Sequence, residues 1–297
     1  MQWVKSMAKA IRQRVSIGMP AYNGEKWIGE AIESILAQTF TDFELIVSDN
    51  ASTDATEQIC REYVKRDSRV RYFRNAKNIG ANPNFNRVFQ LSSSEYFKWA
   101  SANDIVEPEM LAKCVEVLDG EPEIVMCYPR TKIFSDASSA AEKYQDNCHL
   151  VSSRPSIRFI GLLENMKLNN VMNGMIRSEV LKKTKLIENY FSSDVNLIAE
   201  IALYGKIFEI PEYLFLRRLE KESSTALKSA EGVHEHYYPE RKKSMRFQQW
   251  IMTFKNFAAI ARVDVDVREK VALYTYLIRR AIWFRHQLLQ DIIWLKR

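Results

Sequence analysis

The stretch VSIGMPAYNGE at residues 15–25 decides the fold class of this 297-residue chain. A short apolar run ends at turn-forming residues, and apolar side chains then recur at helical spacing through residues 25–37. The same pattern returns in FELIVSDNASTD at residues 43–54, where a predicted buried strand ends at Asp49 before a helix. In an open α/β sheet, ligands bind outside the carboxyl ends of the strands. These paired strand ends therefore predict a ligand site, and the Asp49 carboxylate would suit a hydroxyl-bearing ligand.

Strands and helices continue to alternate through about residue 130, which predicts βαβ units and a largely parallel sheet. Beyond that point the pattern is less regular. It predicts helices near residues 157–166, 178–185 and 194–204, and strands near 171–176, 206–210 and 213–217. The C-terminal part is predicted to form two helices, over about residues 242–262 and 266–296.

The composition, with 46% hydrophobic and 27% charged residues, is typical of a soluble globular protein. We expect a reduced, cytoplasmic protein, because the four cysteines form no C-x-x-C pair and no apolar run reaches the ~20 residues of a membrane span. Residues 240–297 hold 13 Lys/Arg and 5 Asp/Glu, so the positive charge is concentrated in this tail. A weakly acidic body with a basic tail does not resemble a nucleic-acid-binding domain.

Three aspartates are candidates for chemistry, and each has an ordinary structural alternative. Asp49 would bind a ribose hydroxyl or a base N–H, or would simply end a strand in an Asx turn. Asp104 follows a strand and would ligate Mg²⁺ or Mn²⁺, or would form an Asn-Asp turn with Asn103. Asp194 opens a helix, where an N-cap is the more common role and a general base is the functional alternative.

Several other sites are not supported by the sequence. No G-x-G-x-x-G, G-x-x-x-x-G-K-[ST] or G-x-S-x-G motif is present, which argues against a Rossmann dehydrogenase, a P-loop enzyme and an α/β-hydrolase. The run His234-Glu235-His236 lies in a polar segment and is interpreted as a solvated loop rather than a metal site.

The order and spacing of the motifs resemble family-2 glycosyltransferases of the GT-A fold. The resemblance is carried by residues 15–25, 38–54, 78–80 and 96–104; it is close over about residues 14–130 and looser to about 225. It implies a GT-A domain over residues 1–225, with a nucleotide-binding half (14–130) and an acceptor-side half (131–225). A loop and a basic helical extension would follow over residues 226–297.

The resemblance also implies which residues hold the nucleotide. Pro20, Ala21 and Tyr22 occupy the positions at which the family contacts the base. Asp49 would bind the uracil or ribose of the donor, and Asn78 would lie in a loop that closes over the nucleotide.

The residues implied for the chemistry lie further along the chain. Asn103 and Asp104 fall on the last positions of the family's acidic motif, where Asp104 would face Mn²⁺ or Mg²⁺ and the diphosphate, and Asn103 would help bind the nucleotide. Arg218 would contact phosphate, and Glu220 replaces a residue that is often a metal-binding His. Asp194 matches the catalytic base of an inverting displacement.

The expected donor is a nucleotide-diphosphate sugar, with UDP favoured, and the expected acceptor is a glycan or a lipid-linked glycan. Asn103 and Glu220 depart from the family pattern, so a non-catalytic nucleotide-sugar-binding protein is the alternative. A nucleotidyltransferase is disfavoured because the first loop has a single glycine, Gly24. The basic C-terminal helices would pack on the catalytic domain and would secondarily contact anionic lipid at the inner face of a membrane. The sequence is also compatible with a homo-oligomer.

Overall fold

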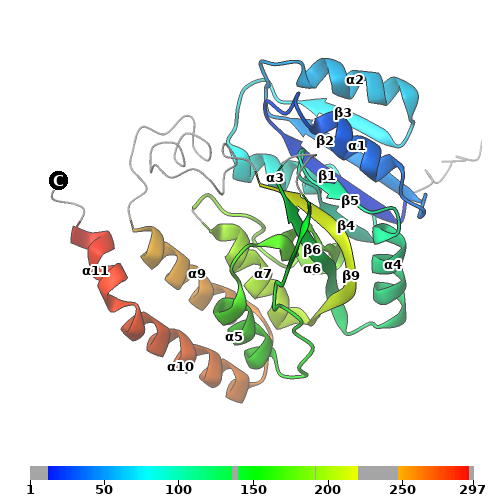
Figure 1. Cartoon of the computed structure of the whole chain (residues 1–297). Helices are drawn as coiled ribbons and strands as arrows, with labels where there is room; N and C mark the ends of the chain where they lie inside the picture. The colour runs from blue at the N-terminus through cyan, green and yellow to red at the C-terminus, as the bar shows by residue number, and fades with distance from the viewer. Residues whose placement is uncertain (1–12, 136–139, 191, 220–246, 294–297) are drawn as a thin grey trace, which may run out of the picture.

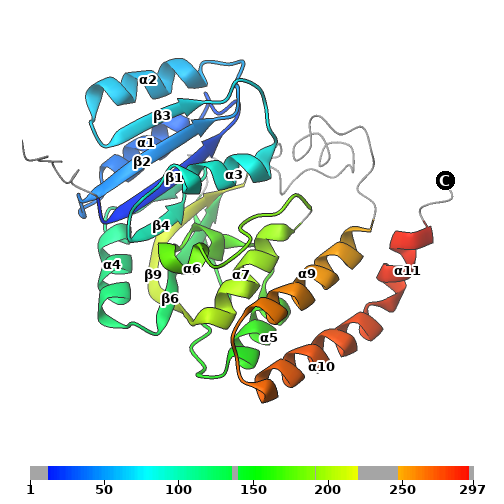
Figure 2. The ribbon, with the colours of Figure 1, turned by 180° about the vertical axis from the view of Figure 1, so that it is seen from behind.

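A nine-stranded sheet runs through the part of the chain described by the computed structural model, namely residues 13–135, 140–190, 192–219 and 247–293. The order along the sheet is β3-β2-β1-β4-β8-β6-β9-β5, and β7 pairs with β6 outside this path. Helices cover both faces of the sheet, and the C-terminal helices form a further layer at one side (Figure 1, Figure 2). The predicted α/β fold, with a mostly parallel sheet and a helical C-terminal region, is confirmed.

The first half of the sheet consists of the predicted βαβ units. Strand β1 lies between β2 and β4, and β2 also pairs with β3, all in parallel. Its elements are β1 (Val15–Ala21), α1 (Ile28–Leu36), β2 (Phe43–Asp49), α2 (Thr56–Arg66), β3 (Val70–Arg74), α3 (Ala81–Gln90) and β4 (Tyr96–Trp99). The register sets Ala21 opposite Asp49, so the two quoted motifs end side by side.

Alternate side chains of these strands bury into two hydrophobic clusters, because successive residues of a strand point to opposite faces. In β2, Leu45 and Val47 join the cluster that includes α1, whereas Ile46 joins the cluster that includes α3. Gly18 lets α3 approach the sheet closely, since a Cβ atom there would lie 2.6 Å from the Val88 side chain.

The second half of the sheet is mixed. Strand β8 lies antiparallel between β4 and β6, β6 and β9 run parallel, and β5 is antiparallel to β9. Its strands are β5 (Ile105–Val106), β6 (Ile124–Phe134), β7 (Glu142–Tyr144), β8 (Met175–Arg177) and β9 (Lys206–Arg218). Its helices are α4 (Met110–Gly120), α5 (Pro155–Asn165), the 3-10 helix η1 (Asn170–Asn173), α6 (Ser178–Leu181) and α7 (Ser193–Tyr204).

The two strands predicted over residues 206–210 and 213–217 are one strand, β9. This strand pairs with β6 over its length, and the register of the pairing shifts around Pro129 and Arg130. The consequence is that Arg217 and Arg218 form the end of a paired strand.

Three helices follow the sheet: α9 (Gln248–Arg262), α10 (Val267–Trp283) and α11 (Arg285–Ile293). Helix α9 contacts α7, and α10 contacts α5 and α9. The single helix predicted over residues 266–296 is divided at Phe284. Among the helices of the described ranges, none is both long and apolar enough to cross a membrane. The predicted domain boundary at residues 225/226 lies outside the described residues.

Candidate active site

A cavity of about 350 Å³ lies where β4, β9 and the start of α7 converge. Its wall includes four predicted site residues that are far apart in the sequence: Asn103, Asp104, Asp194 and Arg218. The antiparallel pairing of β5 with β9 sets Ile105 opposite Leu216 and so brings the residues after β4 to the end of β9. The structure thus gathers two carboxylates and two arginines, Arg217 and Arg218, around one space.

Asp104 is a buried carboxylate held by the backbone of β9. Its Oδ1 accepts a hydrogen bond from the Arg218 N–H at 2.8 Å. Burial raises the pKa of Asp104, and hydrogen bonds from Arg218 and Ser101 and the charges of Arg217 and Lys98 oppose this shift. Burial of a charged carboxylate costs free energy, and a cation beside Asp104 would offset that cost.

The side-chain oxygens around Asp104 show whether the residues present fit the predicted metal ion. Within the described ranges no group of three or more His, Cys, Asp or Glu side chains could hold a metal. Asp104 and the neighbouring Asn103 nevertheless fit a Mg²⁺- or Mn²⁺-type site, because such ions use one or two carboxylates and take further ligands from substrate phosphates. The other predicted ligand, Glu220, lies outside the described residues, as does His234-Glu235-His236.

Asp194 does not cap α7. The N-cap is Ser192, which has a φ of 60°, and the cap makes no side-chain hydrogen bond. Asp194 lies in the first turn, and its Oδ2 accepts a hydrogen bond from the Asn169 Nδ2 at 2.9 Å. The carboxylate is therefore oriented from outside its own helix, in the wall of the cavity.

The neighbouring Asn170 orients an arginine in the same wall. Its Oδ1 accepts from the Arg217 Nη1 at 2.5 Å, and its Nδ2 donates to Asp146 at 2.8 Å. Burial raises the pKa of Asp146 to about 6, although hydrogen bonds from Thr131 and Asn170 lower it. Consecutive asparagines thus hold the candidate base on one side and a cation on the other. Neither asparagine was identified from the sequence, because an Asn-Asn pair carries no motif that indicates such a role.

Arg218, the predicted phosphate ligand, is packed into the protein. Its side chain is 1% exposed, forms an ion pair with Glu30 and donates from Nε to the Asn103 carbonyl at 3.0 Å. The guanidinium lies 3.7 Å from the centre of the Trp27 ring and 4.4 Å from that of Phe134. These contacts indicate a clamp that joins α1, the loop after β4 and the end of β9.

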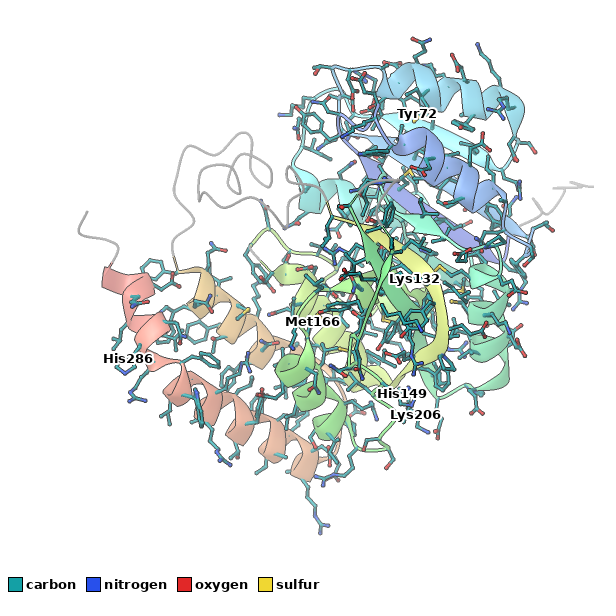
Figure 3. The ribbon with its side chains drawn as sticks, in the orientation of Figure 1. Tyr72, Lys132, His149, Met166, Lys206 and His286 are labelled. Atoms are coloured by element: carbon teal, nitrogen blue, oxygen red, sulfur yellow. The ribbon has the colours of Figure 1, made fainter. Side chains whose placement is uncertain are left out.

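The predicted nucleotide residues lie beyond the cavity, at the carboxyl edge of the first strands. Asp49 is fully buried: Oδ1 accepts from the Ser52 N–H at 2.8 Å, and Oδ2 from the hydroxyl of Tyr72 and from Arg74, both at 2.6 Å. Figure 3 shows Tyr72 in this part of the molecule. The local-turn role of Asp49 is thus present in the structure, and its carboxylate also anchors β3.

The other residues of this edge are held in place by backbone pairing and a buried amide. Pro20 and Ala21 end β1, and the Asn50 N–H donates to the Ala21 carbonyl at 2.8 Å. Tyr22 follows them and is 47% exposed. The buried Asn50 donates to the Asn78 Oδ1 at 2.7 Å, so it fixes the loop that leads into α3. Since α3 itself lines the cavity, this loop connects the predicted nucleotide edge to the candidate active site.

Comparison with known proteins gives this chain its family. The family model for glycosyl transferase family 2 matches residues 16–184, more than half of the chain. This chain belongs to glycosyl transferase family 2. The predicted family and activity class, a glycosyltransferase with the GT-A fold, are therefore confirmed.

Relatives of this family-2 glycosyltransferase cover different shares of its length. An uncharacterized glycosyltransferase of Haemophilus influenzae is 28% identical over 266 residues, which is 87% of this chain and 79% of that protein. The chondroitin synthase of Escherichia coli is 36% identical over 102 residues, which is 34% of this chain and 15% of the synthase.

Solved structures share the fold at low sequence identity. S. aureus TarS 1-349 in complex with UDP has a TM-score of 0.64 at 17% identity, covering 91% of this chain and 72% of that one. The mannosyltransferase PcManGT from Pyrobaculum calidifontis, in complex with GDP-Man and Mn²⁺, has a TM-score of 0.54 at 15% identity, covering 95% and 84%.

Proposed function

We propose that this glycosyltransferase moves a hexose from a nucleoside-diphosphate sugar, with UDP as the nucleotide, to a hydroxyl of a glycan or lipid-linked glycan, with inversion. The observation that carries the proposal is the shared cavity of Asp194, Asp104 and Arg217. It places a candidate base, a candidate metal ligand and a cation around one space. The UDP complex of S. aureus TarS supports the choice of donor.

In the proposed reaction Asp194 is the general base. Its carboxylate takes the proton of the acceptor hydroxyl while that oxygen bonds to the anomeric carbon. The bond from the anomeric carbon to the diphosphate oxygen breaks, and its electron pair leaves with the nucleoside diphosphate. Since the acceptor oxygen enters opposite the leaving group, the configuration inverts.

The leaving diphosphate gains negative charge, and cations would stabilise it. Asp104 and Asn103 would hold a Mg²⁺ or Mn²⁺ ion, with Glu220 as a further oxygen ligand. When bound, that ion would neutralise charge on the diphosphate. Of the chain's own cations, we assign this role to Arg217, because Asn170 orients it at the cavity. Arg218 pairs with Glu30 and packs against two aromatic rings, and only its Nη1 has no partner among the described residues.

The test of the proposed function is substitution of the base. We expect Asp194→Asn to lower turnover at least about 100-fold, because the amide cannot accept the acceptor proton, while donor binding is kept. Release of nucleoside diphosphate from a panel of nucleotide sugars, with and without Mn²⁺, measures turnover. Thermal shift with the same panel measures donor binding.

Two outcomes would contradict this assignment. Full activity of Asp194→Asn would exclude Asp194 as the base. A wild-type protein that is stabilised by a donor but consumes none with any acceptor would instead favour the nucleotide-sugar-binding alternative, which is motivated by Asn103 and Glu220.

We place the reaction in the assembly of a surface polysaccharide or glycolipid, on the cytoplasmic side of the membrane. The partial similarity to a chondroitin synthase, which is named for a polysaccharide, supports this placement. Incubating the protein with lipid-linked and with soluble oligosaccharide acceptors would distinguish the two acceptor classes.

A further inference from the structure

Helix α10 carries an apolar stripe on its outward face. Val267, Val271, Ile278 and Ile282 recur at helical spacing and are 74%, 59%, 53% and 59% exposed. The helix packs through its opposite face, where Leu273 and Leu277 are buried in the core. An exposed apolar stripe of this length indicates an interaction surface.

Cations border this stripe on both sides. On a helical projection, Arg268 and Arg279 lie along one border and Lys270 along the other. The acidic residue of the first turn, Glu269, is directed inward, where it accepts hydrogen bonds from the side chain of Arg154 at 2.9 Å and the Ser156 N–H at 2.8 Å. The outward face of α10 is therefore apolar and basic.

The charge pattern selects the kind of partner. If two copies met through the stripe, the flanking rows of both would be basic in either orientation, so like charges would face each other. An anionic lipid surface has the opposite charge. It would also accept the aliphatic side chains at the boundary between headgroups and acyl chains.

The junction of α10 and α11 exposes a tryptophan beside arginines, which are side chains suited to contact with lipid headgroups. Trp283 is 80% exposed and lines an open hollow of about 470 Å³ together with Arg279, Ile282, Arg285 and His286. Exposed Trp beside Arg is typical of membrane–water interfaces, where the indole lies at the level of the headgroups. Figure 3 shows His286 at the outer side of the molecule, on the C-terminal helices.

We infer that the outward face of α10, with the α10–α11 junction, docks on an anionic bilayer. Val267, Val271, Ile278 and Ile282 enter the interface, and Arg268, Lys270, Arg279 and Arg285 contact lipid phosphates. The sequence predicts membrane contact only from the charge of the tail, whereas the structure assigns it to one face of one helix. The inference does not depend on glycosyl transfer.

Vesicle flotation of the full chain tests this surface. We expect wild type to bind vesicles of phosphatidylcholine and phosphatidylglycerol, and to bind phosphatidylcholine alone much more weakly. Ile278→Glu/Ile282→Glu should reduce binding at least about tenfold, because two aliphatic side chains that would enter the lipid interface become charged. Arg279→Gln/Arg285→Gln should also weaken binding and lessen its sensitivity to salt.

Matched controls come from α2, at the far end of the molecule from α10 (Figure 1). Val64 is an exposed aliphatic residue there, and Arg61 and Arg66 are surface arginines. We expect Val64→Glu and Arg61→Gln/Arg66→Gln to bind vesicles like wild type.

Four results would overturn the inference. Wild type would fail to bind anionic vesicles, or Val64→Glu would lose binding as much as the α10 variant. A clear fall in the melting temperature of Ile278→Glu/Ile282→Glu would show that the stripe is packed within the chain. A concentration-dependent dimer in sedimentation that the same variant abolishes would assign the stripe to a second copy. Because no donor or acceptor is present, these failures are distinct from a failure of the proposed reaction.

Discussion

The side-chain amide of Asn169 hydrogen bonds directly to the candidate base, Asp194. A carboxylate only accepts hydrogen bonds, so the contact with Asp194 directs the Asn169 nitrogen toward it. The amide oxygen is buried and has no hydrogen-bond partner among the described residues. Asn169 is thus a positioning residue for Asp194.

Asn169→Asp should change the pH dependence of catalysis. It sets a second carboxylate beside Asp194, and like charges favour protonation, so the acid limb of kcat/KM should move up by about one pH unit. The pH–rate profile measures this shift. Asn165→Asp on α5 is the matched control, because within the described part of the chain the Asn165 side chain bonds to its own helix, at the Gly161 carbonyl. An unchanged acid limb with lowered activity would reduce Asn169 to a structural role.

At the scale of the element, two adjacent arginines at the end of β9 have different surroundings. Arg217 is held at the cavity by Asn170, and Arg218 is clamped between two aromatic rings. We expect Arg217→Gln to lower kcat at least about tenfold while changing the free energy of unfolding by less than about 1 kcal/mol. Arg218→Lys should cost about 2–3 kcal/mol of stability, because a single ammonium cannot reach Glu30 and the Asn103 carbonyl together and cannot stack on the Trp27 and Phe134 rings.

Urea denaturation together with steady-state kinetics separates these two effects. Arg217→Lys is the control for charge alone, since it keeps a cation but loses the planar fork that meets Asn170. If Arg217→Gln destabilised the fold as much as Arg218→Lys, the division of roles between the two arginines would be wrong.

The elements of the first half could be predicted from sequence because their signals are local. Helix α1 buries Ile28, Ala31, Ile32 and Ile35 at the spacing that the sequence displays, and β2 ends at the predicted Asp49. Of the residues that line the cavity, the sequence singled out the motif positions Asn103, Asp104, Asp194 and Arg218.

What could not be predicted depends on contacts between distant segments. The pairing of β9 with β6 determines which arginine is clamped, and the loop at residues 169–170 reaches the cavity only through tertiary packing. The complete burial of Asp49 depends on Tyr72 and Arg74 of β3, which local sequence does not reveal.

At the scale of the whole molecule, a lysine is buried in the middle of the sheet. Lys98 of β4 is 1% exposed and donates to the Trp99 carbonyl at 3.0 Å. Burial lowers its pKa from 10.5 to about 8, against the attraction of Asp104. The contribution of Lys98 to stability should therefore be most favourable above pH 10.5 and should fall as the pH decreases to about 8, below which its cost is constant.

Lys98→Met should remove this cost. We expect it to raise the free energy of unfolding by about 1–3 kcal/mol at neutral pH, because an unbranched apolar side chain replaces a desolvated ammonium. Urea denaturation across neutral and alkaline pH measures the difference, which should shrink as the pH rises through about 8. A variant that is less stable at every pH would show that the Lys98 contacts outweigh its desolvation.

The place of β4 in the sheet has a consequence for biosynthesis. Its parallel neighbour β1 precedes it in the chain, but its antiparallel neighbour β8 begins only at Met175. While the ribosome makes the segment between β4 and β8, β4 is an unpaired edge of the sheet. On this strand, Lys98 lies between the apolar residues Phe97 and Trp99. An inward-pointing lysine on such an edge discourages pairing with another nascent chain. The Lys98 charge, which lowers the stability of the folded protein, would thus hinder aggregation of the incomplete chain.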